Sequence, residues 1–181
     1  MPIRNVKMGK NVHYHDENLL NLYGCTIGDN CKIGAFTEIG PCKIGANVNI
    51  GAHCFIPEGI TIKDNVFIGP GVVFLNDKHP PSYGLWRNER KTNIRKGAVI
   101  GGGAVILPGV EIGQDAIIGA GSVIVNSVTS GDLAYGNLVS NAAELKKKEE
   151  KYYKLCMGSW NKLRYLEVKV AQLRECLKKG S

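Results

Sequence analysis

The sequence predicts an all-β protein, a parallel β-helix with three short strands per coil, followed by an α-helical tail. Three observations support this prediction. Between Ile27 and Thr129 an aliphatic residue, or phenylalanine once, recurs at nearly every sixth position. A glycine often follows this recurring residue directly. The period stops near residue 130, and the sequence becomes strongly helical from about residue 142.

We call the recurring residue the anchor. A period of six fits neither an α-helix, with about 3.6 residues per turn, nor an alternating strand. It fits short strands joined by tight corners, so that three units form a coil of about 18 residues with each anchor pointing inward. Glycine after the anchor would let the backbone turn where a side chain would clash. The anchors are Ile27, Ile33, Ile39, Ile44, Ile50, Ile56, Ile62, Ile68, Phe74, Ile94, Ile100, Ile106, Ile112, Ile118 and Ile124.

A second inward position lies four residues after the anchor and carries a small or apolar residue. Stacked coils would therefore bury one continuous core. One step, from Ile39 to Ile44, has five residues instead of six. Residues 1–26 show the poorer period expected of a terminal repeat that caps the stack. Full coils are expected at residues 27–43, 44–61, 62–79, 94–111 and 112–129.

The period is interrupted once by an insertion. From Phe74 to Ile94 there are twenty residues where six were due, so about fourteen are extra. The expected loop, at about residues 75–93, is polar and contains two prolines and Trp86. Loops on a rigid scaffold often carry function, so we expect a flap over a ligand or a neighbouring subunit.

The tail separates from the β-helix in both pattern and charge. We expect a β-helix domain at residues 1–140 and a helical tail at 141–181. The tail holds 11 Lys/Arg and 5 Asp/Glu, a net +6, whereas residues 1–140 hold 12 and 11, a net +1. We interpret the basic tail as a solvated helix face, not a nucleic-acid or lipid site. The tail also contains a heptad seam, a row of apolar residues spaced alternately by three and four: Leu163, Leu166, Val170, Leu173 and Leu177. This seam indicates that the helix pairs with a helix of another subunit or docks on the β-helix.

Composition narrows the functional classes. No run of about 18 apolar residues occurs, and the N-terminus lacks an apolar segment, so we expect a cytoplasmic protein without membrane insertion. No C-x-x-C motif is present. Cys31, Cys42 and Cys54 fall on or beside the inward positions and are interpreted as core thiols. We expect no metal site.

Candidate chemistry gathers around the insertion. Glu58 and Asn76 occupy the same position after successive anchors and should lie one coil apart, about 4.8 Å along the axis. His53 lies on the preceding face of the Glu58 coil. His79 follows where the loop leaves the scaffold, and a histidine there could act as a general base because its usual pKa lies near working pH.

The sequence Phe-Leu-Asn-Asp-Lys-His-Pro at residues 74–80 resembles two signatures of the hexapeptide-repeat acetyltransferases. The His79-Pro80 pair is similar to that of the sugar O-acetyltransferases, where the histidine is the general base. Asn76-Asp77 is similar to the nucleotide-linked amino-sugar N-acetyltransferases of surface-glycan synthesis. Residues 53–62, His-Cys-Phe-Ile-Pro-Glu-Gly-Ile-Thr-Ile, also resemble the second group. The resemblance covers roughly residues 5–140.

This resemblance implies a left-handed parallel β-helix assembled as a homotrimer, with acetyl-CoA in grooves between subunits. Residue by residue, Gly103, Ala120 and Gly121 match positions that contact the cofactor. Asn126 stands where many members carry the lysine of a Thr-Lys pair, and Lys146 to Lys148 offer a substitute for that phosphate contact. In the related γ-type carbonic anhydrases a histidine triad binds metal, and the four histidines here do not reproduce it.

The first hypothesis is an acetyl-CoA-dependent N-acetyltransferase acting on a nucleotide-linked amino sugar. Its predicted catalytic residues are His79 and Asn76, and its predicted substrate-binding residues are His53, Glu58 and Asp77. The alternative is an O-acetyltransferase of a sugar or small hydroxyl compound with His79 as base. A third and weaker hypothesis is a non-catalytic β-helix scaffold.

Overall fold

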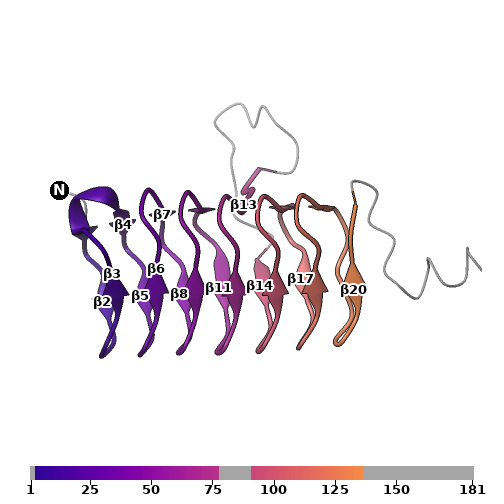
Figure 1. Ribbon diagram of the computed structural model, residues 1–181, viewed down its shortest axis with the longest axis horizontal. Helices are drawn as coiled ribbons and strands as arrows, with labels where there is room; N and C mark the ends of the chain where they lie inside the picture. The colour runs from indigo at the N-terminus through magenta and orange to yellow at the C-terminus, as the bar shows by residue number, and fades with distance from the viewer. Residues whose placement is uncertain (1–2, 78–90, 137–181) are drawn as a thin grey trace, which may run out of the picture. The chain divides into compact units, whose positions relative to one another are not determined.

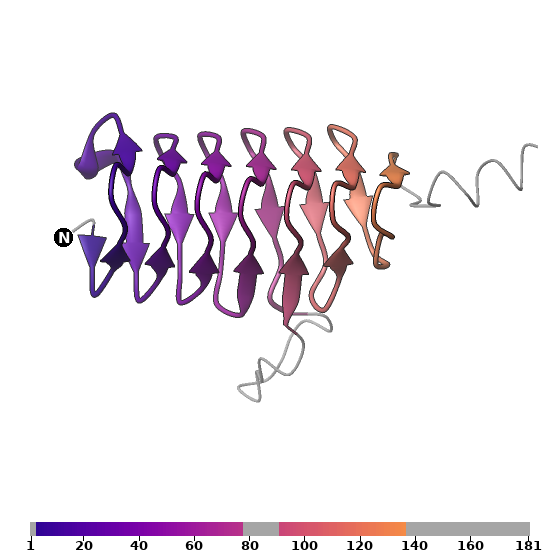
Figure 2. The ribbon, with the colours of Figure 1, turned by 90° about the horizontal axis from the view of Figure 1, so that it is seen from below.

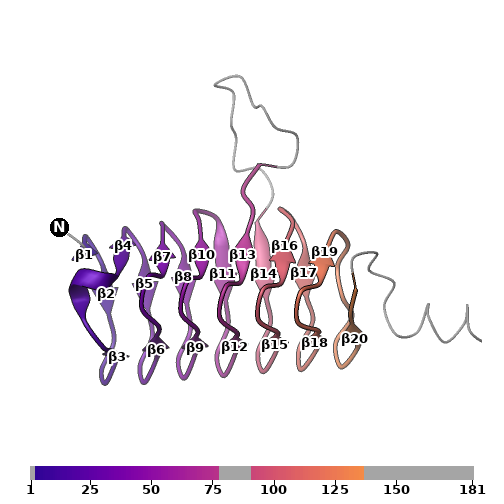
Figure 3. The same cartoon turned by 45° about the horizontal axis from the view of Figure 1, so that its top comes forward.

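A computed structural model describes residues 3–77 and 91–136 of the chain. These residues form coils of three short parallel strands that stack side by side (Figure 1). The strands of successive coils make three parallel sheets, which we call A, B and C (Figures 2 and 3). This arrangement confirms the predicted all-β, parallel β-helix fold. One short 3₁₀ helix, η1 (Glu17–Leu19), precedes the second coil.

Sheet A contains β1 (Ile3–Arg4), β4 (Asn21–Tyr23), β7 (Glu38–Ile39), β10 (Phe55–Ile56), β13 (Val73–Phe74), β16 (Val105–Ile106) and β19 (Val123–Ile124). Sheet B contains β2 (Lys7–Met8), β5 (Thr26–Ile27), β8 (Lys43–Ile44), β11 (Ile60–Ile62), β14 (Thr92–Ile94) and β17 (Glu111–Ile112). Sheet C contains β3 (His13–Tyr14), β6 (Lys32–Ile33), β9 (Asn49–Ile50), β12 (Phe67–Ile68), β15 (Val99–Ile100), β18 (Ile117–Ile118) and β20 (Leu133–Ala134).

The register follows the anchors. In sheet B, Ile27 pairs with Ile44, Ile44 with Ile62, Ile62 with Ile94, and Ile94 with Ile112. Neither the five-residue step nor the insertion disturbs this pairing. The scaffold therefore continues in register on both sides of residues 78–90.

The core consists of the two predicted inward positions. All fifteen anchors are buried, none more than 4% exposed, and the second inward position is buried as well. The four cysteines among the described residues, Cys25, Cys31, Cys42 and Cys54, are buried free thiols. Burial raises the pKa of each of these thiols. The interpretation of Cys31, Cys42 and Cys54 as core thiols is confirmed.

The glycine after the anchor avoids a steric clash, as predicted, but the clash is with the backbone of the next coil and the glycine does not itself form the turn. A Cβ atom on Gly51 would lie 2.4 Å from the backbone nitrogen of Pro70, and one on Gly113 would lie 2.3 Å from that of Ser130. Neither glycine has a positive φ. The turn itself occurs two residues after such a glycine. Examples are Asn30 after Gly28 and Asn47 after Gly45, which have φ of 59° and 56°. Glycine is needed here because the next coil approaches too closely for a side chain.

The predicted helical tail at 141–181 lies outside the described residues, as do His79, Trp86 and most of the insertion. The tail, its heptad seam and the domain boundary at residue 140 therefore stay predictions.

Candidate functional site

The three sheets meet at three edges, which we name by the sheets they join. The chain passes from sheet A to sheet B at the A/B edge, from B to C at the B/C edge, and from C back to A at the C/A edge. Figure 3 shows the insertion leaving the stack after β13 and the chain returning at β14. Both flanks of the insertion thus lie at the A/B edge.

The A/B edge carries the residues predicted to orient the acceptor. Phe55 pairs with Val73, so Glu58 and Asn76 hold corresponding places in successive coils, as the sequence predicted. Both side chains are exposed, and Asp77 is half-buried beside Asn76. Pairing of Phe74 with Ile106 and of Ile106 with Ile124 places Asn126 on the same edge, two coils beyond Asn76.

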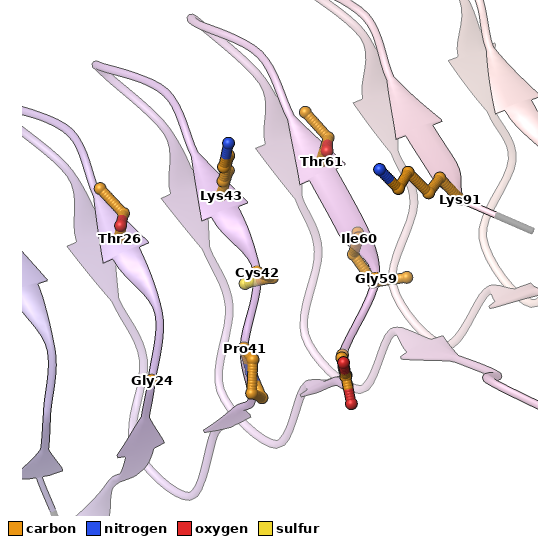
Figure 4. Close-up of a pocket in the computed structure, with 10 residues that line it drawn as sticks. Gly24, Thr26, Pro41, Cys42, Lys43, Gly59, Ile60, Thr61 and Lys91 are labelled. Atoms are coloured by element: carbon orange, nitrogen blue, oxygen red, sulfur yellow. The ribbon is translucent and has the colours of Figure 1, made fainter. Parts of the chain in front are cut away.

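A recess opens on this edge, on the N-terminal side of Asn76. Figure 4 shows Lys43 and Lys91 at its rim, with Thr26 and Thr61 on the same face of sheet B. Its volume is about 340 Å³, and Glu58 also lines it. Neither Lys43 nor Lys91 was predicted from the sequence.

The C/A edge carries a column of residues in one unusual backbone conformation. Its members, from the second coil onward, are Phe36, His53, Gly71, Gly103 and Gly121, with φ between 58° and 70°. The rings of Phe36 and His53 stack with their centroids 4.9 Å apart and their planes at 20°. The other three members have no side chain. The column is therefore bulky at its N-terminal end and bare at its C-terminal end.

The bare part of the column is open to an external group. A Cβ atom on Gly71 or Gly103 would meet only atoms at 3.8 Å or beyond, and one on Gly121 would meet nothing within 4 Å. Phe36 and His53 show that this column accepts side chains at the same backbone angles. Internal packing therefore does not explain why three successive members are glycine. The positive φ of these three residues favours glycine, and the glycines leave the backbone uncovered.

The structure separates the predicted site residues into two groups. His53 shares the C/A edge with Gly103 and Gly121, whereas Glu58 lies on the A/B edge because strand β10 runs between them. Asn126 lies on the A/B edge, away from Gly121. Ala120, next to Gly121, is exposed. Sheet A lies between the two groups, so the described part of a single chain does not bring them together.

The backbone N–H groups of the bare column are already occupied. Gly103 donates to the carbonyl of Pro70 at 2.8 Å, and Gly121 donates to that of Gly102 at 2.9 Å. These two residues therefore offer a ligand space and carbonyl groups, not N–H donors. Gly71, which continues the column, was not among the predicted cofactor residues, although the period places it in the same column as Phe36 and His53.

The N-terminal part of sheet A carries a polar cluster. The Tyr23 hydroxyl donates to Oε1 of Glu38 at 3.2 Å, and the guanidinium of Arg4 lies 5.7 Å from the Tyr23 ring centroid. Burial and the hydrogen bond to Glu38 raise the pKa of Tyr23, so this phenol stays protonated at neutral pH. We assign Tyr23 a structural role, because its hydroxyl group lies close to Gly40.

Residues 3–77 and 91–136 contain neither a metal-binding cluster nor a membrane-spanning helix. In that part of the chain, no three His, Cys, Asp or Glu side chains gather closely enough to hold a metal ion. Over the same residues, no helix has the length and apolar character that crossing a bilayer demands.

Comparison with protein families and curated sequences gives consistent matches. Residues 24–58, 41–76 and 91–126 match the family described as "Bacterial transferase hexapeptide (six repeats)". The chain is 37% identical over 146 residues to Nodulation protein L of Rhizobium leguminosarum bv. viciae, covering 65% of this chain and 76% of that protein. It is 34% identical over 119 residues to Nodulation protein L of Rhizobium meliloti (strain 1021), covering 50% of this chain and 64% of that one.

Solved structures share the fold at lower identity. One is AntD, an N-acyltransferase from Bacillus cereus in complex with dTDP and 3-hydroxybutyryl-CoA, with a TM-score of 0.59 and 22% identity, covering 86% of this chain and 89% of that one. Another is the acetyltransferase domain of PglB from Neisseria gonorrhoeae FA1090 in complex with acetyl coenzyme A. Its TM-score is 0.56 and its identity 18%, covering 75% of this chain and 56% of that one.

Proposed function

We propose that this chain, which belongs to the bacterial hexapeptide-repeat transferases, transfers an acetyl group from acetyl-CoA to the amino group of a nucleotide-linked amino sugar. The observation that carries the proposal is the bare half of the C/A column. A long, narrow acyl donor needs a backbone surface without side chains, and Gly71, Gly103 and Gly121 supply one over successive coils. Exposed Ala120 extends the same surface.

The acceptor belongs on the other edge. Asn76 and Asp77 lie at the A/B edge, where the insertion that contains His79 begins. Glu58, one coil away, has a carboxylate suited to an ammonium group. AntD, which shares the fold, is an N-acyltransferase seen with dTDP and an acyl-CoA. That pair of ligands matches the two substrates proposed here.

Joining the two edges requires more than one subunit, and we place the site between neighbours in a homotrimer. Exposed apolar residues occupy consecutive places on sheet C, where Phe67 pairs with Val99, Val99 with Ile117, and Ile117 with Leu133. These four side chains are 36–48% exposed. By contrast, the outward row of sheet B is polar from Lys7 to Glu111. Exposed apolar rows of this kind indicate a protein interface.

The reaction balances without a redox partner. The neutral amine attacks the thioester carbonyl carbon, a C–N bond forms, the C–S bond breaks, and the sulfur leaves as a thiolate. The nitrogen loses one proton, which ends on the thiol of CoA. Asn76 would orient the amine and His79 would accept its proton. An amine with a lone pair is already nucleophilic, so positioning contributes more to this reaction than base catalysis.

The O-acetyltransferase remains the second candidate because of the His79-Pro80 pair. A hydroxyl acceptor must lose its proton as it attacks, so the base would contribute about 10² to 10⁴-fold to the rate. The two candidates therefore differ in how strongly turnover depends on His79.

The test is release of free thiol from acetyl-CoA in the presence of a panel of nucleotide-linked amino sugars and neutral glycans. We expect release only with an amino-sugar acceptor. Asn76→Ala should then reduce turnover more than His79→Ala, and His13→Ala serves as a control on an exposed histidine in β3. The reverse order, with release from a neutral glycan, would identify the O-acetyltransferase. No release with any acceptor would leave the scaffold hypothesis.

A further inference from the structure

The recess on the A/B edge is lined by the corners of three successive coils, at Gly24, Pro41 and Gly59. Between Ile39 and Ile44 the corner is one residue shorter than between Ile56 and Ile62. Cys42 consequently turns inward directly after Pro41 and is buried. The corners on either side are formed by Gly24 and Gly59, which have no side chains and φ of 64° and 88°. These three corners line the hollow of about 340 Å³ along this edge.

The rim of the recess carries two ammonium groups. Lys43 stands in the outward row of sheet B between Thr26 and Thr61, with which it pairs through the backbone. Lys91 lies one coil beyond Thr61, two coils beyond Lys43, and also borders the recess (Figure 4). The only salt bridge between described residues joins Arg95 to Glu111, so within this part of the chain neither lysine has a carboxylate partner.

The recess also contains one carboxylate, at Glu58. Glu58 would repel a phosphate but would attract an ammonium group. Two lysines and two threonine hydroxyls next to one acid therefore suit a ligand that is anionic at one end and cationic at the other. A nucleotide-linked amino sugar has this charge pattern, with a diphosphate at one end of the sugar and an ammonium on its ring.

We propose that the recess binds the diphosphate of the acceptor, with Lys43 and Lys91 on the phosphates and Glu58 facing the sugar ammonium. This inference rests on the function proposed above and specifies where its acceptor lies. Lys43 and Lys91 border the recess from either side of the Glu58 coil, and Asn76 follows Glu58 one coil later on the same edge.

The experiment measures binding of dTDP, UDP and thymidine to the full chain by calorimetry at about 0.15 M salt, where the Debye length is about 8 Å. We expect both diphosphates to bind and thymidine to bind far more weakly. Lys43→Met and Lys91→Met should each weaken diphosphate binding about tenfold, the loss expected for one charge-assisted contact. Lys7→Met is the matched control, since Lys7 lies in the same outward row but outside the recess.

Unchanged diphosphate affinity in both recess variants would overturn the proposal, as would an equal loss in Lys7→Met. A second readout separates this inference from the proposed function. If Lys43→Met abolishes diphosphate binding while the wild type acetylates no acceptor, the recess is a diphosphate site and the proposed reaction is wrong. If the wild type acetylates a nucleotide amino sugar and both variants keep its KM, the reaction stands and the recess assignment falls.

Discussion

The imidazole of His53 stacks on the ring of Phe36 across two successive coils, with centroids 4.9 Å apart. Both residues hold a positive φ that few side chains adopt, 58° for His53 and 59° for Phe36. Immediately beyond them the same column becomes glycine. The stacked pair therefore marks where the open part of the C/A edge begins, and it closes that edge at one end.

The stack leads to a prediction about His53. Asparagine tolerates the left-handed region, so His53→Asn should fold while losing the ring contact. We expect destabilisation on the order of 0.5 kcal/mol, because both rings are largely exposed. Urea denaturation measures it. The sequence predicted that His53 binds substrate. If His53→Asn raises the KM for the acceptor without changing stability, a role in substrate binding is supported over a structural role.

The B/C edge yields a prediction about the asparagine ladder. Nδ2 of Asn30 donates to Oδ1 of Asn47 at 3.3 Å, and Nδ2 of Asn47 donates to Oδ1 of Asn65 at 3.1 Å. Asn47→Ala loses both bonds and replaces asparagine, which tolerates the left-handed region, with alanine, for which that region costs roughly 1–2 kcal/mol. Asn47→Gly loses the same bonds without that penalty. Alanine should therefore destabilise more than glycine in urea denaturation, and equal effects would contradict this explanation.

A third prediction concerns acid stability. Arg95 Nε and Nη2 donate to the two carboxylate oxygens of Glu111, each at 3.0 Å. The hydrogen bond from Arg95 lowers the pKa of Glu111. A lowered pKa stabilises the fold fully above the usual carboxyl value, about 4.3, and this contribution disappears as the pH falls through the lower folded value.

Thermal unfolding of wild type and Glu111→Gln between about pH 7 and pH 3 measures this contribution. The variant should be less stable at neutral pH, and the difference should vanish toward the acidic end. Arg95→Gln should show the same trend, with little further loss in the double variant. A difference that persists at low pH would mean that the carboxylate charge is not its cause.

The periodic part of the fold could be predicted from sequence because burial and period are linked. Every anchor from Ile27 to Ile124 is buried, since a β-helix corner forces each sixth side chain inward. The reason why positions 51 and 113 must be glycine was harder to predict from the sequence. It depends on how closely the next coil approaches, which no single repeat reveals.

The candidate site was predictable only one edge at a time. Glu58 and Asn76 were placed together correctly because both follow an anchor by two residues. His53 was correctly placed on the face that precedes Glu58, whereas Asn126 was grouped with Gly121 but lies on another edge, because a short strand separates neighbouring corners. The recess could not be derived either. The step at Ile39 was visible, but Lys43 and Lys91 come together only through pairing of distant coils.

The last prediction tests the bare column directly. Gly121→Asn keeps a residue that accepts φ of 68°, and a Cβ there meets nothing within 4 Å. The variant should therefore fold with nearly unchanged stability. Its side chain would occupy the space proposed for the acyl donor, so the KM for acetyl-CoA should rise about tenfold or more, equivalent to about 1.4 kcal/mol.

Gly131→Asn is the matched control. Its φ is 74° and it also has nothing within 4 Å, but it does not belong to the C/A column. It should leave the KM for acetyl-CoA unchanged. If Gly121→Asn and Gly131→Asn behave alike in steady-state kinetics and in acetyl-CoA titration, the donor does not lie along Gly71, Gly103 and Gly121. The open space at Gly121 would then need another explanation, such as close packing of a neighbouring subunit. A change in the mass in solution of Gly121→Asn, but not of Gly131→Asn, would indicate such packing.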